Sequence, residues 1–229
     1  MFATTRYPWF EQLRGRFVVF DGPDGSGKST QLARFHQQAD DHGLTVCEVR
    51  EPGGTHIGEE IRKVLLDAKH EEEAPIELRC EMMLFMASRA QLIAQRVRPA
   101  LARGELVLAD RFISSTLAYQ GAAGGLPIDD IIAVGRVALG ECWPDLIVVF
   151  DVDEQTARQR MNPLLRDGEF DTAHDRMESK GDSFHRKVRG GYLDQAQRDP
   201  GHYLVVDATK DPDTVWERLT SGMQDKLGG

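Results

Sequence analysis

The sequence is poor in cysteine, and its few cysteines stand far apart. Only three of 229 residues are cysteine (Cys47, Cys80 and Cys142), and no two of them form a Cys-x-x-Cys spacing. Disulfide frameworks and zinc sites need paired or closely spaced cysteines, so both are disfavoured. An odd number of isolated thiols is typical of a protein in a reducing compartment.

Long apolar runs and an excess of positive charge are also missing. No stretch approaches the roughly 18 consecutive apolar residues of a membrane-spanning helix, and residues 1–16 lack the apolar run of a secretory signal. The 28 basic residues are outnumbered by 37 acidic ones, which gives a net charge of −9. We therefore expect no broad binding to nucleic acid or to a membrane, and any polyanion has to bind at a local basic site.

The first residues leave two interpretations open. They carry three arginines and a single acid, Glu11, a composition also found in organelle-targeting segments. The simpler interpretation is a surface extension, residues 1–15, in which Trp9 and Phe10 pack on the outside of the domain. We accordingly expect a cytoplasmic protein.

A glycine-rich segment at residues 22–29 has the P-loop pattern Gly-x-x-x-x-Gly-Lys-Ser. Glycines let the backbone curl so that several N–H groups point at one anion, and the next helix adds its dipole. Lys28 is expected to reach the outer phosphates and Ser29 to bind Mg²⁺. The expected nucleotide contacts are Gly22, Pro23, Asp24, Gly25, Ser26, Gly27, Lys28, Ser29 and Thr30; Pro23 has no N–H to offer.

Short apolar runs alternate with helical periodicity along the whole chain. We expect strands at residues 17–20, 44–49, 105–109, 145–150 and 203–206, and helices at 28–42, 57–66, 75–98, 128–139, 179–198 and 211–226. The core face of the first helix should carry Leu32, Ala33, Phe35 and Ala39. This alternation predicts an α/β fold with a doubly wound, five-stranded parallel sheet, and we expect a single domain over residues 1–229.

Charged residues follow two of the predicted strands. Arg50 ends one, and Asp110 and Arg111 follow another, where open α/β sheets bind their ligands. An acid there can hold magnesium, and an arginine can grip a phosphate. For Arg50 alone, a solvated surface charge is the alternative.

The helix predicted at residues 75–98 places Phe85 and Arg89 on one face, because residues four apart are neighbours. They could line one cavity together, although by residue type alone Phe85 is core and Arg89 a surface charge. The methionines of this helix pack either in the core or against a second copy of the chain. Further along, a polar face carries four residues that could contact a base or sugar or simply lie at the surface: Ser115, Thr116, Tyr119 and Gln120.

Residues 153–177 are polar and have too few apolar side chains for a core. We interpret them as a lid that closes over a ligand, with a disordered loop as the alternative. The arginines of this region are Arg158, Arg160, Arg166 and Arg176.

Five segments together resemble the thymidylate kinase family: the P-loop, Arg50-Glu51-Pro52-Gly53-Gly54, the helix of Phe85 and Arg89, residues 110–120, and Asp175-Arg176-Met177-Glu178. They occur in that family's order and spacing. Its members transfer the γ-phosphoryl of ATP to dTMP and share a P-loop kinase fold with a mobile lid. The resemblance implies ATP and dTMP as ligands, Mg²⁺ as cofactor, and a homodimer.

The resemblance also implies roles for individual residues. Asp24 faces the acceptor's sugar, and Arg50 and Arg111 grip its phosphate. Phe85 stacks on thymine, and Arg89 donates a hydrogen bond to its carbonyl edge. Ser115, Thr116, Tyr119 and Gln120 complete the pocket, in which Tyr119 rejects ribonucleotides by crowding the 2′ position, and Ser29, Asp110 and Glu178 organise magnesium.

The transfer chemistry needs positive charge rather than a general base, because the second pKa of a phosphate is about 6. Some family members carry an arginine at the P-loop position that is Gly25 here, so the lid has to supply it. Arg160 and Arg176 are the leading candidates, ahead of Arg158 and Arg166, and Lys28 and Arg111 complete the catalytic set.

Three other functions are weighed against this one. A kinase for another nucleoside monophosphate or a nucleoside is the nearest. A P-loop switch protein is disfavoured because residues 208–211, Ala-Thr-Lys-Asp, lack the spacing of the guanine-reading motif. A catalytically silent homologue is disfavoured by intact Lys28, Asp110 and Arg111.

Overall fold

A five-stranded sheet forms the centre of the computed structural model, which describes residues 7–67, 75–161 and 181–228. All neighbouring strands are parallel, in the order β2-β3-β1-β4-β5. Their bounds are β1 (Phe17–Asp21), β2 (Val46–Arg50), β3 (Leu106–Asp110), β4 (Leu146–Asp151) and β5 (Tyr203–Asp207). The predicted doubly wound, five-stranded parallel sheet is confirmed.

Every strand ends one residue later than the apolar pattern predicted. The extra residues are Asp21, Arg50, Asp110, Asp151 and Asp207. Their side chains are polar, so hydrophobicity excludes them, but their backbones still pair: Arg50 lies opposite Asp110, and Asp151 opposite Asp207. The carboxyl edge of the sheet is thus lined with charged side chains.

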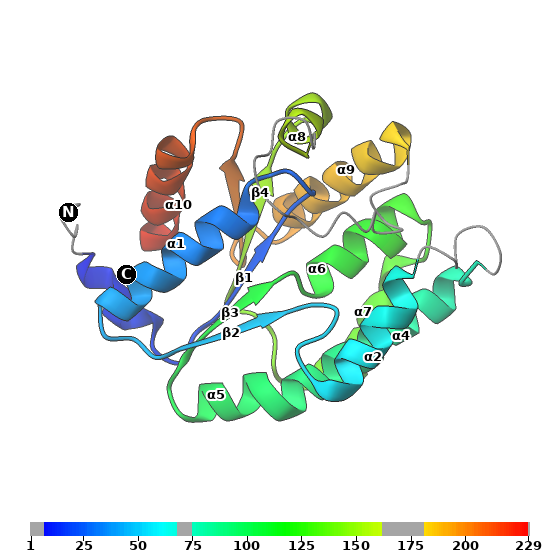
Figure 1. Ribbon diagram of the computed structural model, residues 1–229, viewed down its shortest axis with the longest axis horizontal. Coiled ribbons are helices and arrows are strands. Elements are labelled where there is room, and N and C mark those ends of the chain that lie inside the picture. The colour runs from blue at the N-terminus through cyan, green and yellow to red at the C-terminus, as the bar shows by residue number, and fades with distance from the viewer. Residues whose placement is uncertain (1–6, 68–74, 162–180, 229) are drawn as a thin grey trace.

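Helices cover both faces of the sheet. In chain order they are α1 (Lys28–Asp41), α2 (His56–Leu66), α4 (Leu78–Leu92), α5 (Arg98–Ala102), α6 (Ile113–Thr116), α7 (Ile128–Leu139), α8 (Glu154–Met161), α9 (Asp182–Arg198) and α10 (Pro212–Leu227). In Figure 1, α1 and α10 lie on one side of the sheet, and α4, α5 and α7 on the other. No helix in the described ranges is long and apolar enough to cross a membrane.

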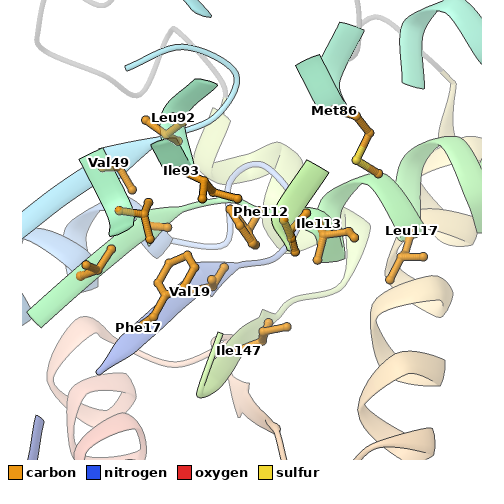
Figure 2. Packing of buried hydrophobic residues seen from close by; sticks show 14 of the residues in the cluster. Phe17, Val19, Val49, Met86, Leu92, Ile93, Phe112, Ile113, Leu117 and Ile147 are labelled. Atoms are coloured by element: carbon orange, nitrogen blue, oxygen red, sulfur yellow. The ribbon is translucent and has the colours of Figure 1, made fainter. Parts of the chain in front are cut away.

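Alternate residues along the central strands build two separate cores, because successive strand side chains point to opposite faces. Phe17 and Val19 of β1 belong to the core under α4 and α7, and Val18 and Phe20 to the core under α1 and α10. Figure 2 shows the first core, where Phe17 and Val19 lie among residues of the neighbouring helices, including Ile93. Covering both faces explains why the strands read as continuous apolar runs.

Two expectations about the α1 side are wrong. Trp9 and Phe10 were expected on the outside, but they are 4% and 0% exposed and pack in the second core from the 3₁₀ helix η1 (Pro8–Leu13). Ala33 was expected in the core and is exposed, while Gln31 is buried. The Gln31 amide donates to Pro212 O at 2.8 Å, so a polar side chain is tolerated there.

The helix expected at residues 75–98 also differs. It begins later, at Leu78, and continues beyond residue 98 through a π-helical segment, η2 (Ile93–Val97), and α5. A proline normally ends a helix pattern, but here the chain stays helical through Pro99, which directly follows the π-helical segment. A second π-helical segment, η3 (Leu117–Ala123), follows α6 directly.

Candidate active site

Two cavities open at the carboxyl edge of the sheet, with volumes of about 310 Å³ and 630 Å³. Asp24, Lys28 and Ser29 line both. We call the smaller one the acceptor cavity and the larger one the donor cavity. The P-loop therefore stands between two adjoining spaces.

The P-loop adopts a conformation that depends on its glycines. Gly25 has φ +75°, and a Cβ atom on it would clash with the backbone of Ala157, coming within 3.0 Å of the Ala157 Cα. Gly27 has φ +82° and precedes α1, whose N-terminus is capped by no side chain of the described residues. The first N–H groups of α1 are thus left without helical partners, and together with the helix dipole they favour an anion.

The donor cavity contains all the predicted nucleotide contacts except Gly22. Pro23, Gly25, Ser26, Gly27 and Thr30 line it in addition to the three shared residues. Gly22 lies beside the acceptor cavity, where its carbonyl accepts from Arg111 Nη1 at 3.1 Å. The remaining wall comes from α1, from α8, from the connection between β5 and α10, and from α10 itself: Gln31, Arg160, Ala208, Thr209, Lys210, Asp211, Pro212 and Val215.

Arg160 joins two walls of the donor cavity. Its Nη1 donates to Ala208 O at 2.8 Å and its Nη2 to Lys210 O at 3.1 Å, and Nη1 also lies 3.4 Å from Ser26 O in the P-loop. Of the predicted lid, the structure describes α8, where Ala157 is buried against the P-loop. Arg166, Arg176 and Glu178 lie outside the described residues.

The acceptor cavity brings together every residue predicted to bind the phosphate acceptor. They come from distant parts of the chain: Asp24, Arg50, Phe85, Arg89, Arg111, Ser115, Thr116, Tyr119 and Gln120. Five further residues line it to which no individual role was assigned from the sequence: Glu51, Pro52, Arg62, Leu66 and Phe112.

Arg89 is buried in this wall, and the alternative that it is a surface charge is wrong. It is 1% exposed, and its Nε and Nη2 donate to the Glu51 carboxylate at 2.6–3.0 Å. Nη2 also donates to Thr116 Oγ1 at 3.1 Å, and Nη1 lies 3.1 Å from Met86 Sδ, a weak acceptor. Burial raises the pKa of Glu51, although Arg89 opposes it. The guanidinium is thus fixed through Nε and Nη2, and Nη1 has the weakest hydrogen-bond acceptor of its three nitrogens.

Arg111 follows β3 in an unusual backbone conformation, with φ +68°. Such a conformation is costly for a residue with a Cβ and is found mostly at functional sites. The side chain forms an ion pair with Asp24 through Nη2. Burial by itself raises the pKa of Asp24, but Arg111 and Lys28 outweigh it, so this pKa lies below its ordinary value.

A buried hydroxyl and carboxylate network supports Arg111 from behind. Arg111 Nη1 donates to Ser115 Oγ at 3.2 Å and to Tyr192 OH at 3.3 Å. Both hydroxyls lie within 2.8 Å of Asp21 Oδ1, and Ser114 Oγ donates to Asp21 Oδ2 at 2.6 Å. Asp21 and Tyr192 are both 0% exposed. Neither was predicted, because Asp21 falls between the expected strand and the P-loop, and Tyr192 lies in a helix to which no functional role was assigned.

Arg50 is more exposed than Arg89 and Arg111. Its Nη2 lies 3.3 Å from Glu59 Oε1, and this same carboxylate oxygen accepts from Gly54 N at 2.7 Å. Arg62 Nη1 donates to Pro52 O at 2.9 Å. Side chains of α2 therefore hold the loop that follows β2, and Arg50 stands at the cavity mouth with its guanidinium half free.

The opposite wall is formed by α6 and η3. Tyr119 OH donates to Asp24 Oδ2 at 3.3 Å, and burial keeps the pKa of Tyr119 far above its ordinary value. Gln120 Nε2 donates to Glu81 Oε1 at 2.7 Å, and both side chains are buried. Phe85 is half-buried and presents its ring to the cavity.

The donor set beside Lys28 suits magnesium. Ser29 and Asp110 both line the acceptor cavity, and they offer a hydroxyl and a carboxylate. Asp110 forms an ion pair with Lys28, and no group of three or more His, Cys, Asp or Glu side chains in the described ranges could hold a metal by itself. Mg²⁺ takes few protein ligands and completes its shell with water and substrate phosphates, so the residues present fit that ion.

Comparisons with known proteins agree with this geometry. A family model described as Thymidylate kinase matches residues 20–219. The chain is 43% identical over 221 residues to a thymidylate kinase of Desulforudis audaxviator (strain MP104C), covering 93% of this chain and 94% of that one. It is 37% identical over 217 residues to a thymidylate kinase of Geobacillus sp. (strain WCH70), covering 95% and 100%.

The fold is also similar to a solved structure of the same description. The crystal structure of thymidylate kinase from Ehrlichia chaffeensis superposes with a TM-score of 0.69 at 27% identity, covering 91% of this chain and 98% of that one. Both the sequence match and the structural match span almost the whole chain, and the site residues lie inside the matched region. The chain belongs to the thymidylate kinase family.

Proposed function

We propose that this protein transfers the γ-phosphoryl group of ATP to dTMP, giving dTDP and ADP. The observation that carries the proposal is the pair of cavities that meet at Asp24, Lys28 and Ser29. A phosphoryl transfer between two nucleotides needs two sites whose reacting phosphates adjoin, and the shared residues are of the types that bind phosphate and magnesium.

The donor cavity is assigned to ATP. The P-loop backbone and the N-terminus of α1 bind its phosphates, and Lys28 reaches the outer ones. Ser26 Oγ is buried with no hydrogen-bond partner among the described residues, so it is available to a phosphate oxygen. Ser29 and Asp110 would hold Mg²⁺, which neutralises charge on the transferring phosphoryl group when bound. Glu178 remains a candidate for the same ion.

The acceptor cavity is assigned to dTMP. Arg111 and Arg50 grip its phosphate, Asp24 and Tyr119 contact the deoxyribose, and Phe85 stacks on the base. Ser115, Thr116 and Gln120 complete the wall. Arg89 offers only N–H donors, which suit a carbonyl oxygen of thymine and oppose the amino group that cytosine carries at the same edge.

The step itself requires charge and orientation. The attacking phosphate oxygen is already largely ionised near neutral pH, so no residue has to remove a proton. Lys28, Arg111 and Arg160 supply positive charge from the P-loop, from the residue after β3 and from α8, and Arg176 remains a candidate from the residues beyond α8. Such fixed charges stabilise the transition state because they need no reorganisation during the reaction.

Our wider expectations accompany this activity. We propose that residues 1–229 act as one domain, as a cytoplasmic homodimer, without nucleic acid or a membrane as partner. The net charge of −9 supports the exclusion of polyanionic partners. Kinases for other monophosphates are less favoured, since the family match runs through both cavities.

A coupled assay of ADP release tests the proposal. ADP should form only when ATP, Mg²⁺ and dTMP are all present. Lys28→Ala should abolish turnover, because the buried lysine next to Asp110 is lost. Lys63→Ala should leave turnover unchanged, because Lys63 is exposed on α2 and pairs only with the nearby Glu60 among the described residues. ADP release that does not depend on dTMP would contradict the proposal.

A further inference from the structure

Tyr192 is a buried hydroxyl that the reaction as assigned above does not use. It lies on α9, is 0% exposed, and is absent from the described lining of both cavities. Its ring packs edge-on against Tyr119, with centroids 6.5 Å apart. Its hydroxyl nevertheless contacts the hydrogen-bond network behind Arg111 in the acceptor site. A residue this deeply buried with a polar tip needs partners, and those partners identify what it does.

Asp21 orients the hydrogen bonds of the network, in which Ser115 Oγ and Tyr192 OH also lie 2.8 Å apart with either able to donate. Asp21 Oδ1 can only accept, so it receives Tyr192 OH at 2.6 Å and Ser115 Oγ at 2.8 Å. With their protons directed at Asp21, both hydroxyl oxygens can accept from Arg111 Nη1, which lies 3.2–3.3 Å from each. Burial raises the pKa of Tyr192 well above its ordinary value, so it remains a donor at neutral pH. Two hydroxyls thus connect a buried carboxylate to one nitrogen of Arg111.

Arg111 needs such support more than most arginines do. Its backbone has φ +68°, so its side chain leaves the chain in an unusual direction. Asp21 lies 3.5 Å from Nη1, too far for a hydrogen bond by itself. The two hydroxyls fill that gap, while Gly22 O accepts the other Nη1 proton at 3.1 Å. Nη1 is therefore held by three acceptors of the protein itself, on Gly22, Ser115 and Tyr192.

We infer that Tyr192 is a positioning residue for the acceptor phosphate: its hydroxyl, held by Asp21, accepts from Nη1 of Arg111 and so sets the direction in which the guanidinium meets the phosphate. The inference rests on the proposed assignment of the acceptor cavity to dTMP. α9 itself is anchored to the sheet, since Arg189, one turn before Tyr192, binds both oxygens of Asp151 at 2.6 and 2.8 Å. The hydroxyl is therefore delivered from a fixed helix.

A comparison of the affinities for dTMP and thymidine separates this role from a purely structural one. Thymidine has the base and sugar of dTMP but not the phosphate, so its binding does not depend on the orientation of the Arg111 guanidinium. Tyr192→Phe removes only the hydroxyl and keeps the ring against Tyr119. By calorimetry we expect this variant to bind dTMP about 10-fold more weakly, the loss of one hydrogen bond to a charged group, and to bind thymidine as the unmodified protein does.

Tyr203→Phe is the matched control. Tyr203 OH donates to Gln195 Oε1 at 2.9 Å, and Gln195 lies on α9 one turn after Tyr192. Tyr203 is outside the described lining of both cavities. This variant should bind dTMP and thymidine normally. Ser115→Ala is the second variant, and it should also weaken dTMP more than thymidine. In kinetics, the KM for dTMP should rise in both test variants while the KM for ATP stays unchanged.

Equal weakening of dTMP and thymidine in Tyr192→Phe and Ser115→Ala, or unchanged dTMP affinity in both, would overturn the inference. If Tyr192→Phe does not fold, Ser115→Ala decides by the same comparison. Failure of the proposed function looks different, because the unmodified protein would then neither bind dTMP nor turn it over.

Discussion

At the scale of residues, the pair of Glu51 and Arg89 shows why a buried charge matters to recognition. Helical spacing was enough to put Phe85 and Arg89 on one face, but nothing in the sequence marks Glu51 as Arg89's partner, 38 residues away. Glu51 stands in a turn of polar and glycine residues, where an acid is usually solvated. Only the folded loop after β2 brings its carboxylate under α4.

Arg89→Lys should lower the selection of dTMP over dCMP by about 10-fold or more, because lysine has no planar fork to satisfy Glu51 and Thr116 together. The measurement is kcat/KM for both nucleotides. Arg96→Lys serves as the control. Arg96 is exposed just beyond α4, and its Nη2 makes only long contacts among the described residues, to Glu48 O at 3.4 Å and to Cys47 Sγ at 4.0 Å. Unchanged selection in Arg89→Lys would remove Arg89 from base recognition.

Gly25 and Gly43 have nearly the same backbone φ, so a comparison of their alanine variants isolates the contact that Gly25 makes with α8. Both have a left-handed φ, +75° and +71°, but Gly43 has no described atom within 4 Å of its Cβ position, whereas Gly25 faces α8. Each substitution by alanine should cost about 1–2 kcal/mol of unfolding free energy through strain. Gly25→Ala should cost more and should also weaken ATP binding. Equal losses, with ATP affinity retained, would show that α8 does not depend on Gly25.

At the scale of elements, the apolar pattern was most informative for the strands and least informative where helices are irregular. The central strands β1, β3 and β4 were located because they are buried on both faces, whereas the edge strands β2 and β5 are only partly buried. The π-helical segments η2 and η3 were not foreseen, because each continues an α-helix, α4 and α6, without a break in the chain's helical conformation. Tyr192 was missed because α9 has few apolar residues and reads as a polar surface helix, although it lies over η3 and its Val188 is fully buried.

The connection from β5 to α10, which walls the donor cavity, gives a prediction about pH. Asp207 accepts from Thr209 N and Oγ1 and pairs with Arg218, and these contacts lower its pKa to about 2 from an ordinary 3.8. The folded pKa is depressed, so the stability that the ionised carboxylate contributes is present above pH 4 and is lost as the pH falls toward 2.

Thr209→Val should therefore raise the pKa of Asp207 toward its ordinary value, and Thr209→Ser should leave it low because serine keeps the hydroxyl. Titration of the side-chain carboxyl by NMR measures both. Because the Asp207 side chain is half exposed, the accompanying change in stability should be small. A pKa that stays near 2 in Thr209→Val would show that the backbone N–H of residue 209 and Arg218, rather than the hydroxyl, keep the pKa of Asp207 low.

At the scale of the whole molecule, the order of motifs was more informative than any single one. The P-loop alone indicates a nucleoside triphosphate, and the residues after β2, β3 and in α4 add an acceptor. The sequence could not show that the site's charges are paired internally, Lys28 with Asp110, Arg111 with Asp24 and Arg89 with Glu51. Those pairings depend on side chains from different strands and helices meeting at one edge of the sheet.

The homodimer is a further prediction at this scale. Met82 and Met86 of α4 point into the core, but Met83 is 54% exposed, and Ile57 and Val64 on the neighbouring α2 are exposed as well. If these helices meet a second copy, Met83→Glu should convert a dimer to a monomer in sedimentation equilibrium at micromolar concentration. Ala33→Glu, exposed on α1 across the sheet, should leave the dimer intact. A monomer in the unmodified protein would refute the prediction.

The central claim is that the acceptor cavity selects dTMP as the phosphoryl acceptor. The most direct measurement is kcat/KM with ATP and Mg²⁺ for dTMP, dUMP, dCMP, dGMP and thymidine under the same conditions. We predict that dTMP is the best substrate, that dCMP and dGMP are poor, and that thymidine is not phosphorylated because it offers no phosphate to Arg50 and Arg111. A higher kcat/KM for any of the other four would contradict the claim.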